Sequence, residues 1–130
     1  MNKISEHVYI LSPDKRTDRP ILGAIAGKSG TLIVDAGNSP EHARLLLNGL
    51  EKIDIPQPKS VSITHGHWDY VFGASVFNVP IIANQEKFLS TESSHWTGIH
   101  PQVGGKQHSV LLLSTDASTL AICASRCAVS

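Results

Sequence analysis

Residues 63–73, ITHGHWDYVFG, join the end of an apolar run to a close group of potential metal ligands. The run is predicted to be a strand, and it ends directly before His65, His67 and Asp69. Because residues two apart in an extended chain project to the same side, His65 and His67 can converge on one metal ion, and Gly66 lets the backbone turn between them. Asp69 follows where the chain is expected to bend into a helix, and its carboxylate can bind a neighbouring metal or hold a water molecule.

The types of ligand in this stretch indicate which metal would bind. Two imidazoles and a carboxylate suit zinc, with iron and manganese as alternatives. Ligand sites of α/β proteins lie beyond the carboxyl ends of strands, which is where these residues fall. The competing interpretation is that the histidines are loop residues making ordinary hydrogen bonds. We predict a metal site formed by His65, His67 and Asp69.

Strands and helices alternate on both sides of this stretch. Ser39 can cap a helix that Pro40 begins, and apolar residues then recur at helical spacing as far as Ile53. Another helix is predicted over residues 84–89, with Asn84 as its cap. Apolar runs predict strands over residues 7–11, 20–27, 31–35, 59–64 and 79–83, the second and third of which form a β-hairpin.

The sequence changes character near residue 90. Residues 91–107 are polar and Gly-rich, whereas residues 109–130 are apolar, small and Ser-rich, with a weak strand signal over residues 110–113. We therefore divide the chain into a first domain, residues 1–90, and a divergent tail, residues 91–130, whose structure the pattern does not define. A truncated gene product and a fast-evolving extension would both explain such a tail.

Composition narrows the classes of function. The chain has 130 residues, the size of one domain, and its eleven basic and eleven acidic side chains cancel. This balance and the few aromatic residues argue against a nucleic-acid partner or an acidic membrane surface. No apolar run reaches the roughly 18 residues of a membrane-spanning helix, no signal peptide is recognisable, and Cys123 and Cys127 make no disulfide framework. We expect a cytoplasmic protein that acts on a small molecule, without a nucleic-acid or membrane partner.

The segment THGHWDYVFG resembles the signature of the metallo-β-lactamase superfamily, T-H-x-H-x-D-H followed by a small residue. TLIVDAG, residues 31–37, is similar to the strand that precedes this signature in the family and ends in Asp and Gly. The predicted order of hairpin, helix, strand, motif loop, helix and strand is also the family's order. The resemblance covers roughly residues 4–90.

This resemblance implies an α/β fold, specifically the amino-terminal half of a metallo-β-lactamase-like αββα sandwich. It assigns His65 and His67 to a first metal and Asp69 to a second, and it gives Asp35 the role of holding the motif loop. It implies a metal-dependent hydrolase in which a metal-bound hydroxide attacks an ester, thioester or lactam, with Asp69 as the catalytic residue that orients the hydroxide.

Two departures from the family pattern modify this expectation. The family has histidine where this sequence has Tyr70, and a phenol is a poor neutral ligand, so one zinc ion is expected rather than two. The family's second half, which supplies further ligands, has no counterpart in the recognisable segment. VGGKQHS, residues 103–109, is faintly similar to the Gly-Gly-x-His-Ser stretch that carries a third histidine, which makes His108 a candidate ligand; His95 and His100 are weaker candidates.

The two departures leave two functions open for the chain. The chain is either a hydrolase or a non-catalytic truncated fragment, which has weak or no metal binding or acts only through association with a partner. Self-association through exposed sheet edges is expected if a second half is missing. His7 and His42 are expected to be ordinary surface or strand residues, and Trp68 a packing anchor pointing away from the ligands.

Overall fold

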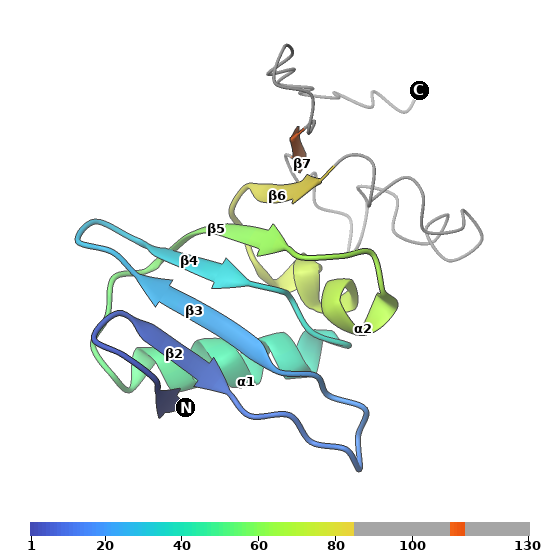
Figure 1. Cartoon of the computed structure of the whole chain (residues 1–130), viewed down its shortest axis with the longest axis horizontal. Helices are drawn as coiled ribbons and strands as arrows, with labels where there is room; N and C mark the ends of the chain where they lie inside the picture. Colours follow the sequence, from blue (N-terminus) through green and yellow to red (C-terminus); the bar gives the residue numbers. More distant parts are fainter. Residues whose placement is uncertain (85–109, 114–130) are drawn as a thin grey trace.

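The computed structural model describes residues 1–84 and 110–113 and forms one seven-stranded sheet (Figure 1). The strands lie side by side in the order of the sequence. They are β1 (Asn2–Lys3), β2 (Val8–Leu11), β3 (Leu22–Ala26), β4 (Thr31–Val34), β5 (Pro58–Ile63), β6 (Ile81–Asn84) and β7 (Val110–Leu113). Helix α1 (Pro40–Glu51) connects β4 to β5, and α2 (Trp68–Val71) with the 3₁₀ helix η1 (Phe72–Val76) connects β5 to β6.

The direction of the strands changes once across the sheet. Strands β1 to β4 pair antiparallel as a meander, whereas β4, β5, β6 and β7 pair parallel. Parallel neighbours require crossover connections, and helices supply two of these. The carboxyl ends of β4, β5 and β6 therefore lie at the same edge of the sheet. Loops that follow β4 and β5 meet there.

The hydrophobic core lies between one face of the sheet and the helices. Leu22, Ile33 and Val61, on three neighbouring strands, are all fully buried. Helix α1 contributes Leu46, which is also fully buried, and the burial of one leucine side chain contributes about 1.5–3 kcal/mol. Buried residues alternate with half-buried or exposed ones along β3 and β4, as expected for strands with one covered face.

The opposite face of the sheet is also apolar. Ile25 is 42% exposed, and it pairs with Val8 on one side and Leu32 on the other. Residues paired directly across a sheet share a face. This face therefore lacks the helical cover that the other face has within the described residues.

Helix α1 begins as its sequence predicts. The Ser39 side chain accepts a hydrogen bond from the His42 backbone N–H at 3.2 Å, and Pro40 occupies the first turn. The prediction for the His42 side chain was wrong, because it is only 1% exposed. Its Nδ1 accepts the Asn38 backbone N–H at 3.3 Å, and within residues 1–84 and 110–113 its Nε2 has no hydrogen-bond partner. Burial lowers the pKa of His42, and the positive charge of Arg19 adds to this effect.

The predicted strands agree closely with the observed ones. Those predicted over residues 7–11, 20–27, 31–35, 59–64, 79–83 and 110–113 correspond to β2 to β7 in turn. Strand β1 was not predicted, because it is only two polar residues long. Asn84 is the last residue of β6, and the helix predicted to follow it, over residues 85–89, lies outside the described residues.

β7 pairs with β6 in the same sheet, while the proposed division at residue 90 stays a prediction. None of the helices in the described part of the chain is long and apolar enough to cross a membrane.

Candidate metal centre

The motif loop is joined to the end of β4 by a buried carboxylate. Asp35 directly follows β4 and Thr64 directly follows β5, so both lie at the same sheet edge. One carboxylate oxygen of Asp35, Oδ1, accepts the Thr64 backbone N–H at 2.8 Å. The Thr64 hydroxyl lies 3.0 Å from Oδ1 and 2.9 Å from Oδ2. The role that the resemblance gave Asp35 agrees with these contacts.

The backbone and burial of Asp35 are both unusual. Its φ angle of 64° lies in the left-handed region, which aspartate and asparagine tolerate better than most residues. The residue is 5% exposed, and this burial raises the pKa of its carboxyl group, an effect that the two hydrogen bonds from Thr64 oppose.

A second tie joins the residues after β4 to α2 and η1. The Ala36 backbone N–H donates to the Tyr70 carbonyl at 2.7 Å, and the Gly73 N–H donates to the Gly37 carbonyl at 2.9 Å. A Cβ atom at Gly73 would overlap the Ala36 carbonyl oxygen, so glycine permits this close approach. The motif loop is thus held at its start, by Asp35, and at its end.

His65 and His67 lie next to each other on this loop. Their ring centroids are 4.8 Å apart and their planes meet at 75°, an edge-to-face arrangement. The His65 Nδ1 lies 2.8 Å from the Thr64 hydroxyl oxygen. The His65 ring also lies near the Tyr70 ring, with centroids 4.3 Å apart and planes tilted by 52°. His65 is half-buried, whereas His67, the residue before α2, is exposed. The structure therefore brings the two histidines together, and their binding to one metal ion stays a prediction.

Within the described residues, Asp69 does not join this pair to form a group of three ligands. Asp69 lies in the first turn of α2 and is half-buried. Among residues 1–84 and 110–113, no three His, Cys, Asp or Glu side chains are grouped as metal ligands would be. His108, His95 and His100 lie outside the described residues. The assignment of Asp69 and His108 as ligands stays a prediction.

The donors that are present suit zinc in kind. Adjacent imidazoles are common zinc ligands, and a catalytic zinc ion takes three protein ligands and leaves one position open. His65 and His67 supply two nitrogens, so they fit part of such a site. Tyr70 contributes its ring to packing against the core and against His65.

Two exposed aromatic rings follow the histidine pair along the chain. Trp68 is 41% exposed and Phe72 is 38% exposed, and their centroids lie 5.7 Å apart. They are one helical turn apart, which brings their side chains together. Trp68, which the sequence predicted to be a packing anchor, thus packs against Phe72 while it stays partly exposed. The sequence could have predicted this pair, because Phe72 is apolar and lies four residues after Trp68.

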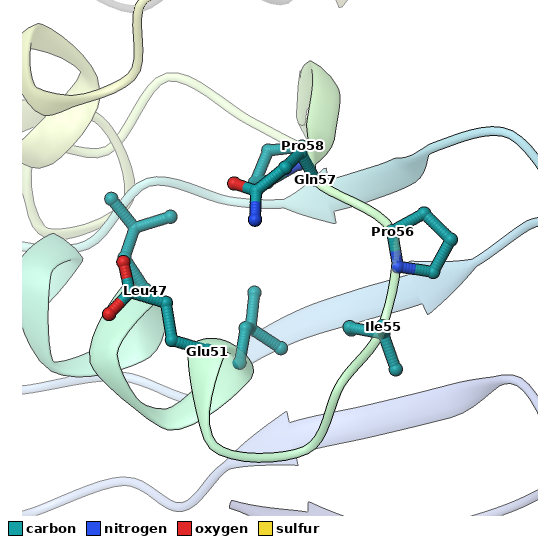
Figure 2. A pocket seen from close by; sticks show the side chains of 7 residues that line it. Leu47, Glu51, Ile55, Pro56, Gln57 and Pro58 are labelled. Atoms are coloured by element: carbon teal, nitrogen blue, oxygen red, sulfur yellow. The ribbon is translucent and has the colours of Figure 1, made fainter.

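A small pocket lies at the other end of the sheet. It has a volume of about 100 Å³ and is lined where α1 ends and β5 begins, by Leu47, Leu50, Glu51, Ile55, Pro56, Gln57 and Pro58 (Figure 2). Because His65 follows the opposite end of β5, this pocket is separate from the histidine pair. Its volume is below the roughly 300 Å³ at which pockets for small-molecule ligands begin.

Comparison with known proteins identifies the family. The family profile described as the metallo-beta-lactamase superfamily matches residues 23–111, more than half of the chain. The chain therefore belongs to the metallo-beta-lactamase superfamily. No curated protein matches the sequence.

Solved structures confirm the fold. A metallo-beta-lactamase from Pontibacter korlensis is 23% identical, with a TM-score of 0.59, and the match covers 84% of this chain and 50% of that one. For the DIM-1 metallo-beta-lactamase the identity is 17%, the TM-score 0.61, and the coverage 92% of this chain and 52% of that one. A variant of the sec-alkyl sulfatase PisA1 is 22% identical with a TM-score of 0.54, covering 67% of this chain and 15% of that one.

These likenesses define what is established. The α/β fold is part of a metallo-β-lactamase fold, as the sequence predicted. The chain spans about half the length of the two metallo-beta-lactamases. Identities of this size show the fold alone, and the names of the relatives differ in the substrates that they imply.

Proposed function

We propose that this chain carries part of the active site of a zinc-dependent hydrolase, with His65 and His67 as ligands of one zinc ion. The edge-to-face pair of imidazoles, held beyond the carboxyl end of β5, is the observation that carries this proposal. Membership of the metallo-beta-lactamase superfamily supports it. A bound zinc ion would supply an activated water at neutral pH and would stabilise negative charge that develops on the substrate.

The chain's own residues would act in three ways. His65 and His67 would bind the zinc ion, and the contacts of the motif loop with Asp35 keep the two histidines in place. Asp69 accepts a hydrogen bond from the attacking water and so orients it toward the substrate. His108 is proposed as the third protein ligand, which a catalytic site needs.

One zinc ion is proposed rather than two. A second ion would need a ligand at the position of Tyr70, and the Tyr70 ring packs against His65 and the core. The substrate class proposed is a small ester, thioester or lactam, because these carbonyl compounds all develop an oxyanion when water attacks. Nothing in the charge balance of the chain favours a nucleic-acid substrate.

The metal content of the purified protein tests the proposal. We expect about one zinc per chain, lost in the double variant His65→Ala/His67→Ala and kept in His7→Ala. His7 is a matched control, because its side chain is 64% exposed and lies on the β1–β2 side of the sheet. Equal zinc contents in all three proteins would contradict the proposal.

Hydrolysis assays then separate the proposed function from its alternative. Asp69→Asn is expected to keep its zinc and to lose hydrolysis of ester, thioester and lactam substrates by about 100-fold or more. The alternative is a non-catalytic chain with weak or no metal binding. It is favoured by the pairing of only two ligand side chains within the described residues. Zinc binding without turnover of any of the three substrate classes would support that alternative.

Self-association through sheet edges is a separate proposal. Strand β1 forms one edge of the described sheet, but it consists of two exposed polar residues, and short polar edge strands oppose the addition of another strand. The proposal therefore concerns the other edge of the described sheet, at β7. Sedimentation velocity over a range of concentrations tests it. A monomer at all concentrations would contradict self-association.

A further inference from the structure

The contacts behind His65 form a continuous chain of hydrogen-bonding groups. The carboxylate of Asp35 lies within 2.9 Å of the Thr64 hydroxyl, which in turn lies 2.8 Å from the His65 Nδ1. We infer that the Thr64 hydroxyl is a positioning group that fixes the tautomer of His65 and leaves its Nε2 free to bind the metal. This inference rests on the proposed function only in naming zinc as the metal that the His65 Nε2 binds.

The direction of the relay follows from counting protons. A carboxylate only accepts hydrogen bonds, and a threonine hydroxyl has one proton to donate. When that proton points to Asp35, the Thr64 oxygen presents lone pairs to His65. The contact at 2.8 Å is then a hydrogen bond only if the His65 Nδ1 carries the proton. In a neutral imidazole the Nε2 then has the lone pair, which is the form that binds zinc.

The opposite direction is disfavoured by charge. If the hydroxyl donated to the His65 Nδ1, the Thr64 oxygen would direct lone pairs at both carboxylate oxygens of Asp35, which lie 2.9 and 3.0 Å away. Hydrogen bonds to an ionised acceptor are roughly twice as strong as those between neutral groups. The Thr64 hydroxyl therefore donates its hydrogen bond to the Asp35 carboxylate, and its oxygen accepts one from the His65 Nδ1–H.

The relay is built into a fixed part of the fold. The Thr64 backbone N–H also donates to Asp35, so the Asp35 carboxylate and the Thr64 hydroxyl are held next to each other independently of His65. Tyr70 lies against the His65 ring, with centroids 4.3 Å apart, and limits its rotation. Groups behind a metal ligand that fix its tautomer and its ring orientation commonly change metal affinity by about 10–100-fold when they are removed.

Three variants test the direction and the position of the relay. Thr64→Val keeps the shape and the backbone N–H of Thr64 but removes the hydroxyl, and Thr64→Ser restores the hydroxyl. Asp35→Asn should reverse the relay, because an amide NH₂ facing the hydroxyl donates to it and the Thr64 proton must then turn to His65. Each variant changes few atoms, and backbone amide spectra check that the fold is retained.

The first readout needs no metal. Nitrogen-15 NMR of the imidazole rings, on the metal-free protein at a pH of about 8.5 where an imidazole is normally neutral, distinguishes the two tautomers. We expect the Nδ1–H form of His65 in the wild type and in Thr64→Ser, a mixture in Thr64→Val, and the Nε2–H form in Asp35→Asn. An Nε2–H form of His65 in the wild type would overturn the inference.

The second readout is zinc affinity, measured by competition with a chromogenic chelator. Thr64→Val and Asp35→Asn should bind zinc about 10–100-fold more weakly than the wild type, with Thr64→Ser close to the wild type. Wild-type affinity in Thr64→Val, together with an unchanged tautomer, would overturn the inference. If the tautomers change as expected but the protein hydrolyses nothing, the relay stands and the proposed function fails.

Discussion

The Asp35 carboxylate accepts the backbone N–H of Thr64 at 2.8 Å, although the two residues are 29 positions apart in the sequence. This contact joins the residue after β4 to the residue after β5, and it is possible because the two strands are parallel neighbours. The position of the histidine pair therefore depends on the pairing of two strands that a 12-residue helix separates in the sequence.

Replacement of Asp35 by alanine is expected to destabilise the protein by about 1–3 kcal/mol. Alanine removes the acceptor for Thr64 and must adopt the left-handed φ of 64°, which costs free energy for a residue without a local hydrogen-bonding side chain. Asparagine tolerates this backbone and serves as the matched variant. Urea denaturation measures both, and equal stabilities of the alanine and asparagine variants would contradict the argument.

Replacement of Gly73 by alanine is expected to cost at least about 2 kcal/mol, because the new methyl group would overlap the Ala36 carbonyl oxygen. Gly23 offers a control, since a Cβ there would lie 3.3 Å from the nearest atom, the Cβ of Val34. Gly23→Ala should therefore be tolerated better. Thermal unfolding of the two variants checks the order, and a more stable Gly73→Ala would show that η1 can move away from Ala36.

Replacement of Leu46 by alanine is expected to lower the free energy of unfolding by about 2–5 kcal/mol, since the fully buried side chain leaves a cavity. Its neighbour Leu45 is 45% exposed, and its replacement by alanine should change stability by less than about 0.5 kcal/mol. Both residues lie in the same turn of α1, so helix propensity is matched. Similar losses in both variants would place the core on a different face of α1.

The stability of the protein is expected to fall as the pH drops below the ordinary pKa of histidine, because of His42. Burial lowers the pKa of His42 in the folded state, so the unfolded chain takes up the proton first as the pH falls. Stability is then lost between the unfolded and the folded pKa and changes no further below the folded value. At high pH both states are neutral, and His42 contributes no pH dependence.

Urea midpoints measured from neutral pH down to mildly acid pH test this expectation. His42→Gln should show a shallower decline than the wild type, whereas His7→Gln, at an exposed position, should follow the wild type. An identical pH dependence in His42→Gln and in the wild type would mean that another group governs the decline.

The sequence predicted most of the sheet, because β3 to β6 are short, contain Val, Ile or Thr, and are bounded by glycine, proline or polar residues. The pairing of His65 with His67 was also predictable, since it depends only on a spacing of two residues after a strand. The family resemblance added a role for Asp35 that no local pattern contains.

Other features could not be predicted because they depend on contacts distant in sequence. His42 falls off the apolar stripe of α1, yet it is buried where residues 37 and 38 close over the start of the helix. Similarly, nothing near Thr64 in the sequence indicates that its hydroxyl would meet a carboxylate 29 residues earlier. A hydrogen bond between residues of two different strands becomes visible only once the register is known.

The strands of the sheet follow the order of the chain, and this has a consequence for biosynthesis. During translation, each strand emerges from the ribosome after the neighbour with which it pairs, so no early strand between β1 and β6 must wait for a distant one. The β1–β4 meander can pair as soon as residue 34 is free, and α1 covers its apolar face about 17 residues later. The histidine loop emerges after β4 and β5 and before β6, so its supporting carboxylate, Asp35, is already in place when the loop forms.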